Sequence, residues 1–151
     1  MGLNINNTLG FSEVKKSRLK SIRIIDVTNC IDLAPILFVV SAYVNANILF
    51  VGTERLAYKE SNRIKSMQEE FAKIGIELEI DEDKCVVKKH GILKDDVVFD
   101  SHNDHRICMA LTILSLICNI KCKITGVECV NKSYPNFFDD LKIAGYEFDI
   151  K

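Results

Sequence analysis

Short segments rich in β-branched or apolar residues alternate along this chain with longer segments whose apolar residues recur at helical spacing. Residues 22–27, 47–51 and 121–125 have the composition of strands, and a glycine closes each of the last two. The full order of predicted elements is β-α-β-α-β-β, followed by β-α-β-α-β. This order predicts an α+β fold, a two-layer helix/sheet sandwich built from repeated β-α-β-α-β-β units.

Each helical segment carries an apolar stripe that predicts a buried face. The second helix stops at Gly75, and the fourth opens at Pro135 and stops at Gly145, in keeping with the usual positions of these residues. Residues 77–80 and 85–88 predict a hairpin with an acidic turn, and residues 97–99 and 146–150 predict further strands. The stripes, from the first helix to the fourth, are Leu33, Ile36, Leu37, Val40 and Val44; Ile64, Met67, Phe71 and Ile74; Ile107, Ala110, Leu111, Leu114, Ile117 and Cys118; and Phe138, Leu141 and Ala144.

The predicted elements divide the chain into two units and a leading segment. We expect the units at about 21–90 and 95–151, with the second lacking the last strand of the first. Residues 1–20 are polar and end in a basic stretch, which favours either a solvated tail or the end of a preceding unit. At 151 residues the chain has the length of one ordinary domain, and its 48% hydrophobic content argues against disorder.

Charge and cysteine usage exclude several classes of protein. The 20 Lys and Arg residues against 21 Asp and Glu residues give a net charge of -1, without the basic footprint of a nucleic-acid-binding protein. The apolar runs are too short to span a bilayer and the start lacks a signal-peptide core, so we expect a cytoplasmic protein with no membrane partner. The six cysteines form no C-x-x-C pair, and His102 and His105 lack a convincing third ligand, so we expect no metal.

Cations gather at the starts of the predicted helices, where the helix dipole disfavours them. Lys59 and Arg63 flank one helix start, and His105 and Arg106 follow another, with Asn62 or Ser61 and Asp104 or Asn103 as candidate caps. Such a cluster can bind phosphate or carboxylate groups. Alternatively, the cations pair with carboxylates such as Glu60 or Asp104, and the spacing leaves both interpretations open.

Two carboxylates, Asp32 and Glu60, lie at or near the predicted helix starts. Asp32 stands where a residue would cap the first helix, which is its simplest structural role. Glu60 lies between two cations and is either their ion-pair partner or a group held for proton transfer beside a bound anion.

Three motifs in order carry a resemblance to a known family. They read RLAYKESNR at 55–63, NDHRICMA at 103–110 and KSYPNFF at 132–138, preceded by DLAP at 32–35. These motifs resemble the C-terminal part of the EPSP synthases, the 3-phosphoshikimate 1-carboxyvinyltransferases of the shikimate pathway. The resemblance implies an enolpyruvyl transferase-like fold of two domains, each with three such units. It also implies transfer of the enolpyruvyl group of phosphoenolpyruvate to the 5-hydroxyl of shikimate 3-phosphate, with release of phosphate.

The resemblance also implies roles for individual residues. Asp32 matches the carboxylate that deprotonates the attacking hydroxyl, and Glu60 matches the acid that protonates the methylene carbon of phosphoenolpyruvate. Lys59 matches a contact to shikimate 3-phosphate, and Asn62 departs from the Asp more usual there. The positions that match the phosphoenolpyruvate-binding cations are Arg63, Arg106 and Lys132, with His105 beside them.

Length is the larger departure from the family. The resemblance covers about the last third of the family's length, so we expect a truncated fold and a fragment of the enzyme, inactive alone. The expected partners are phosphoenolpyruvate and shikimate 3-phosphate, with no cofactor. Two alternatives remain: a fragment like the UDP-N-acetylglucosamine enolpyruvyl transferases, and a non-catalytic module that binds anions or self-associates.

Overall fold

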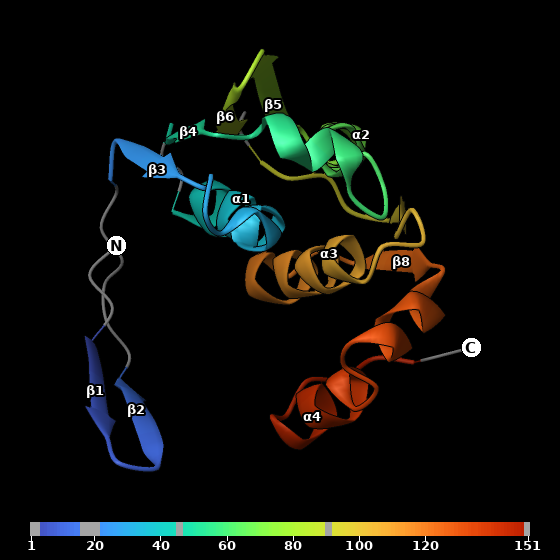
Figure 1. Ribbon diagram of the computed structural model, residues 1–151. Helices are drawn as coiled ribbons and strands as arrows, with labels where there is room; N and C mark the ends of the chain where they lie inside the picture. The colour runs from blue at the N-terminus through green and yellow to red at the C-terminus, as the bar shows by residue number, and fades with distance from the viewer. Residues whose placement is uncertain (1–3, 16–21, 45–46, 90–91, 150–151) are drawn as a thin grey trace.

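The computed structural model describes residues 4–15, 22–44, 47–89 and 92–149 (Figure 1). From its position in the predicted hairpin we expect His90 to be exposed, but His90 lies outside the described residues. The elements are, in chain order, β1 (Asn4–Thr8), β2 (Phe11–Lys15), β3 (Ile24–Asp26), η1 (Ile31–Leu33), α1 (Ala34–Tyr43), β4 (Leu49–Val51), η2 (Glu54–Tyr58), α2 (Arg63–Lys73), β5 (Ile76–Asp81), β6 (Lys84–Lys89), β7 (Val97–Asp100), α3 (His105–Cys118), β8 (Cys122–Thr125), η3 (Val127–Lys132) and α4 (Phe137–Ile143), where η marks a 3-10 helix.

The larger sheet contains four strands in the order β3-β4-β6-β5. β3 and β4 are parallel, and β6 is antiparallel to both β4 and β5. The hairpin of β5 and β6 turns at Glu82, whose positive φ of 48° fits the predicted acidic turn. The order β-α-β-α-β-β of the first predicted unit is thus confirmed, and β7 and β8 form a separate parallel pair.

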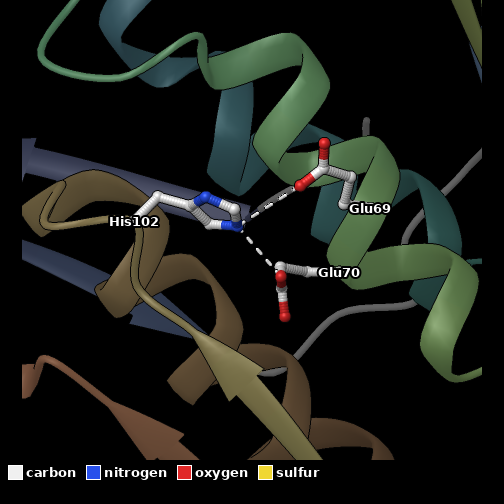
Figure 2. Close-up of side chains that lie close together, drawn as sticks. All are labelled: Glu69, Glu70 and His102. Carbon is white, nitrogen blue, oxygen red and sulfur yellow. Dashed lines mark hydrogen bonds and ion pairs between the residues drawn. The ribbon is translucent and has the colours of Figure 1, made fainter.

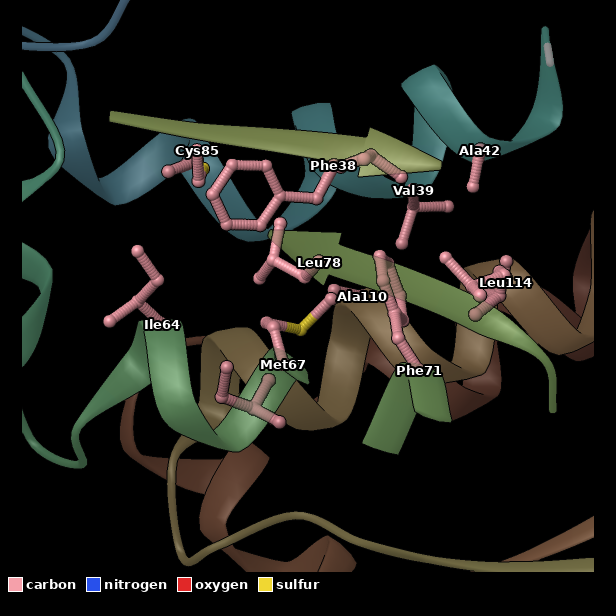
Figure 3. Close-up of a cluster of buried hydrophobic side chains, with 14 of the residues drawn as sticks. Phe38, Val39, Ala42, Ile64, Met67, Phe71, Leu78, Cys85, Ala110 and Leu114 are labelled. Atoms are coloured by element: carbon pink, nitrogen blue, oxygen red, sulfur yellow. The ribbon is translucent and has the colours of Figure 1, made fainter. Parts of the chain in front are cut away.

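The core lies between one face of the four-stranded sheet and three helices. Along β5 the inward Ile76 and Leu78 are buried while the intervening Glu77 is exposed, so only one face of this strand is covered. α2 packs on β5, α1 packs on β6, and α3 packs against α1. Figure 3 shows Phe71 and Met67 of α2 in this cluster, which confirms the stripe predicted for the second helix.

The buried face of α1 differs from the predicted stripe. The structure buries Ala34, Phe38 and Val39 completely, whereas Leu33 is half exposed and Val40 is only partly buried. α1 is apolar nearly all round and contacts both the sheet and α3. Periodicity therefore carries little information about its orientation, because a helix buried on several sides has no single polar face.

The end of the second unit also departs from the prediction. α4 begins at Phe137 rather than at Pro135, and Ala144 is exposed rather than inward. Residues 146–149 form no strand, because the chain turns back at the helix end, where the Tyr146 amide donates to the Leu141 carbonyl at 3.1 Å. The Phe148 ring then packs against Phe138 of α4, with ring centroids 5.6 Å apart.

The first described residues form a hairpin, β1 with β2, which lies apart from the rest of the chain (Figure 1). Apolar side chains on it are exposed, Leu9 and Phe11 most of all. The structure gives regular pairing to residues 4–15, for which the sequence pattern favours a tail or the end of a unit. Within the described part of the chain, no helix is long and apolar enough to cross a membrane.

Candidate functional site

The first residue of α2, Arg63, is the centre of a buried charge network. Asn62 caps this helix, as its side chain accepts from the Lys65 amide at 3.2 Å, which confirms one predicted cap. Arg63 has no exposed surface. Its guanidinium donates to Asp104 Oδ2 at 2.8 Å, to Asp32 Oδ1 at 2.7 Å and to Glu60 Oε2 at 2.5 Å.

Asp104 holds the start of α3 against the start of α2. It caps α3 by accepting from the Arg106 amide at 2.9 Å, and it also accepts from the Ser61 hydroxyl at 3.1 Å. Burial by itself raises the pKa of this carboxyl, but hydrogen bonds from Arg63 and from the Arg106 amide outweigh it, and the pKa is lowered overall. Burial likewise opposes the charge on Arg63, yet the Asp104 carboxylate raises the guanidinium pKa.

Asp32 lies in η1 and faces outward to cations rather than capping a helix. The residue before α1 is Leu33, and neither α1 nor η1 has a side-chain cap, so the predicted capping role is wrong. The carboxylate instead accepts from Lys59 at 3.1 Å and pairs with Arg106 Nη2 at 3.3 Å, in addition to Arg63. Partial burial raises the Asp32 pKa, but hydrogen bonds from Lys59 and Arg63 lower it overall, because they favour the ionised form.

The network contains three cations and three carboxylates, and their charges balance. The sequence left open whether the cations bind an external anion or pair with carboxylates, and in this structure they pair. Lys59 and Arg106 remain partly exposed, at 23% and 33% of their side chains. They hold further N–H donors that a ligand at the surface could reach.

An open pocket of about 430 Å³ lies beside Asp32. Its wall includes Arg55 and Lys59 from the RLAYKESNR motif together with residues 28–33. Sequence reasoning missed Arg55, although it belongs to a motif already singled out. The two cations in the wall of this pocket suit a polar, anionic ligand.

Two other predicted site residues lie outside this charge network. His105 is the first residue of α3 and is buried, and its Nδ1 has no hydrogen-bond partner among the described residues. Lys132 is exposed at the end of η3, which packs against α3, and it makes no ion pair with the three network carboxylates. Conversely, sequence reasoning gave Asp104 only a capping role or a pairing role, and the structure shows that it has both.

Comparison with known proteins gives a consistent result. A family model described as EPSP synthase (3-phosphoshikimate 1-carboxyvinyltransferase) matches residues 1–141. The chain is similar to the 3-phosphoshikimate 1-carboxyvinyltransferases of Clostridium novyi, at 41% identity over 145 residues, and Clostridium acetobutylicum, at 45% over 131 residues. These matches cover 96% and 87% of this chain but only 33% and 30% of the relatives, so the chain spans about a third of their length.

The fold is also similar to that of a solved structure. EPSP synthase from Acinetobacter baumannii superposes with a TM-score of 0.70 at 26% identity, covering 95% of this chain and 36% of that chain. These matches favour the EPSP synthases over the UDP-N-acetylglucosamine enolpyruvyl transferases as the family of reference.

Proposed function

Because the chain belongs to the EPSP synthase family, we propose that it supplies one part of a site that transfers an enolpyruvyl group from phosphoenolpyruvate to shikimate 3-phosphate. The relatives are about three times as long as the matched region. The reaction is therefore proposed for this region together with the other two thirds that the relatives possess. The 151-residue chain alone is expected to release no phosphate, because part of a site does not hold two substrates in a reactive geometry.

The observation that carries this proposal is the buried guanidinium of Arg63, which gathers carboxylates from three separate segments. Asp32 comes from η1, Glu60 from the loop before α2, and Asp104 from the start of α3. Two of these three carboxylates, Asp32 and Glu60, are 45% exposed, and Asp32 also lines the pocket. Exposed carboxylates held rigidly are suited to proton transfer.

The chemistry requires two groups that handle protons. The 5-hydroxyl oxygen adds to C2 of phosphoenolpyruvate as C3 gains a proton, and the tetrahedral intermediate then loses phosphate and a C3 proton. We assign the first acceptor to Asp32, which takes the hydroxyl proton and later returns it to the departing phosphate. Glu60 gives the proton to C3 and takes one back in the elimination, so that protons balance over the cycle.

The cations around Asp32 link its strength as a base to the binding of substrate. While Lys59 and Arg106 pair with Asp32, they hold its pKa low and make it a weak base. A bound phosphate or carboxylate group draws these cations away from Asp32, and the pKa of Asp32 then rises toward the range useful for proton transfer. Binding of the anionic substrates would in this way activate the base.

The remaining cations are assigned to substrate binding. Lys59, Arg106 and Lys132 contact the phosphate and carboxylate groups, with His105 beside them at the start of α3. Arg63 orients the three carboxylates through its hydrogen bonds, and its positive charge favours a bound anion nearby. Planar guanidinium groups and compact ammonium groups both suit such ligands.

The test joins this chain to the upstream two thirds of the Clostridium novyi relative and measures phosphate release with both substrates. The hybrid should turn over, whereas the 151-residue chain alone should not. Glu60→Gln and Asp32→Asn in the hybrid should each lower kcat by about 100-fold or more, because each removes a proton-transfer group. A hybrid that folds but shows no turnover would overturn the proposal.

A binding experiment on the chain alone tests the cation assignments. Titration with phosphoenolpyruvate followed by calorimetry should show weak binding that Arg106→Ala weakens further. Lys65→Ala is the matched control, because Lys65 is an exposed cation on α2 outside the network. Equal losses in the two variants would mean that binding reflects net charge rather than this site.

A second candidate function is self-association, which the exposed hairpin favours. Leu9, Phe11 and Val14 are exposed there without a covering surface among the described residues. We propose that copies of the chain associate through this hairpin, since exposed apolar strands tend to pair. Sedimentation should show a concentration-dependent dimer that Phe11→Ser weakens, and a strictly monomeric chain would exclude this function.

We further propose the cytoplasm as the location of the protein. Its six cysteines are all free, which suits a reducing compartment. Cell fractionation with an antibody to the chain should recover it with cytoplasmic markers, and recovery with membranes would contradict this location.

A further inference from the structure

A second buried carboxylate, Glu70, lies on α2 outside the Asp32 network. Its side chain is 2% exposed. Oε2 accepts from the Lys73 ammonium at 2.6 Å and from the Asp100 amide at 2.9 Å, while Oε1 lies 2.9 Å from His102 Nε2. Figure 2 shows the His102 ring directed from the loop after β7 toward Glu69 and Glu70 of α2.

The same three side chains have the donor types of a metal site, but their contacts favour another role. The ligand atoms of Glu69, Glu70 and His102 lie within 4.8 Å of one another. Both oxygens of Glu70 already face donors, and the Lys73 ammonium would repel a cation at this position. Glu69 is 64% exposed and 3.9 Å from His102, so only Glu70 is held firmly. The cluster is therefore best described as a set of contacts that holds the loop after β7 against α2.

The loop that Glu70 contacts adopts an unfavourable backbone. His102 and Asn103 have φ values of 52° and 53°, in the left-handed region that non-glycine residues rarely adopt. Local bonds hold it there: the His102 amide donates to Asp100 Oδ1 at 2.7 Å, and the Asn103 amide donates to Ser101 Oγ at 3.2 Å. Such a conformation persists only where its surroundings enforce it.

The loop leads directly into the site. Asp104 follows Asn103 and binds Arg63, and Arg106 reaches Asp32 from the first turn of α3. Arg63 and Glu70 are seven residues apart on α2, two turns along one face of the helix. α2 thus holds the loop at two points, through Arg63 on Asp104 and through Glu70 on Asp100 and His102.

We propose that Glu70 is a positioning residue for the transfer reaction: through Asp100 and His102 it fixes the loop of residues 100–104, and so the placement of Asp104 and Arg106. The expected effect on the rate of transfer rests on the proposed function, whereas the expected effect on the loop does not. Glu70 does not line the pocket beside Asp32, and its side chain contacts Lys73, Asp100 and His102, so we assign it no direct contact with substrate.

The first experiment uses the 151-residue chain and does not depend on catalysis. Amide NMR spectra should show that Glu70→Ala shifts or broadens the signals of Ser101, Asp104 and Arg106. Glu69→Gln is the matched control at the neighbouring exposed carboxylate and should leave those signals in place. Unchanged signals in Glu70→Ala would overturn the proposal, whether or not the hybrid enzyme turns over.

The second experiment separates positioning from general destabilisation, in the hybrid with the upstream part of the relative. Glu70→Ala should lower kcat/KM by about tenfold or more, because small displacements of catalytic groups are costly. Glu70→Gln should recover part of this loss, since its amide oxygen still accepts from the Asp100 amide. Met67→Ala, which removes a buried apolar side chain of the same helix but no hydrogen bond to the loop, should lower the unfolding midpoint but leave kcat/KM near normal.

The kinetic outcomes are distinct from a failure of the proposed function. A hybrid without turnover even as wild type counts against the function, and the NMR spectra then decide the role of Glu70. An active hybrid in which Glu70→Ala and Met67→Ala lose kcat/KM equally counts against Glu70 as a positioning residue.

Discussion

Residues 22–89 and residues 97–149 begin with the same order of elements, strand, helix, strand and helix, but they end differently. The first region continues into β5 and β6, which complete a four-stranded sheet over α1 and α2. The second ends with α4 and a segment that forms no strand, so β7 and β8 remain a two-stranded sheet among the described residues. The same initial order of elements is therefore followed by a four-stranded sheet in the first region, which we call complete, and by a two-stranded sheet in the second, which we call open.

The difference shows that a segment with the composition of a strand forms one only where another strand pairs with its backbone N–H and C=O groups. It also locates the site. The charge network joins η1 and α2 of the first region to the start of α3 in the second, so the functional candidates lie where the complete region meets the open one. Substitutions that act on one region or on the junction can test this difference.

The largest effect is expected in the core of the first region. Phe71→Ala should lower the free energy of unfolding by about 3–5 kcal/mol, since it removes a fully buried ring and leaves a cavity. Phe137→Ala should cost less, because Phe137 belongs to a small separate cluster with Cys108, Cys129 and Val130. Urea unfolding of both variants measures the difference, and equal losses would mean that the small cluster around Phe137 contributes as much to stability as the main core.

The next effect concerns the junction. Arg63→Leu should lower the free energy of unfolding by about 3 kcal/mol, because it leaves Asp104 buried without its cation. Adding Asp104→Asn should recover part of the loss, which a double-mutant cycle by urea unfolding measures. Strictly additive losses would show that the Arg63–Asp104 contact does not couple the two regions.

Two glycines with positive φ offer a matched pair, one in each region. Gly145 has a φ of 92° with open space around it, so Gly145→Ala should cost only about 1 kcal/mol for the left-handed backbone. Gly52 has a φ of 75°, and an added Cβ would lie 2.1 Å from Thr28 Oγ1 and 2.9 Å from the Thr28 amide nitrogen. Gly52→Ala should therefore cost more, and similar thermal midpoints for the two variants would contradict this.

The smallest effect is expected from mild acid. The folded-state pKa values of Asp32 and Asp104 are lowered, so their stabilisation is complete above the unfolded value of about 3.9 and is lost as the pH falls through the lowered values. Unfolding free energies should change little between about pH 6 and about pH 4 and then fall. Asp104→Asn should show a shallower fall, and an identical profile would mean that other groups control the acid response.

The sequence predicted the parts of this structure that depend on local patterns. The order of strands and helices from β3 to α4, the caps Asn62 and Asp104, and the buried stripe of α2 all follow from short-range rules. The buried face of α1 could not be predicted in this way, because the elements packed around this helix, rather than its own pattern of polar residues, determine which side is buried. The strand predicted at 146–150 did not form over 146–149, since α4 and Phe148 pack together instead.

Five of the seven predicted site residues lie in the charge network, but the contacts among them were not predicted. Spacing and the family motifs indicated Asp32, Lys59, Glu60, Arg63 and Arg106, and the structure brings all five together. That Arg63 would be buried under three carboxylates depends on contacts between residues up to 41 positions apart, which spacing does not encode. The role of Glu70 depends on the same kind of long-range contact.

The parallel pairing of β7 with β8 has a consequence for the order in which the chain folds. β5 and β6 are joined by a short turn, so their hairpin can form from local contacts within microseconds. β7 and β8 pair only after the 14-residue α3 has crossed between them, because parallel strands require such a connection. We therefore expect the β5–β6 hairpin to form early, and the charge network, which needs α3 docked beside α2, to be among the last contacts made.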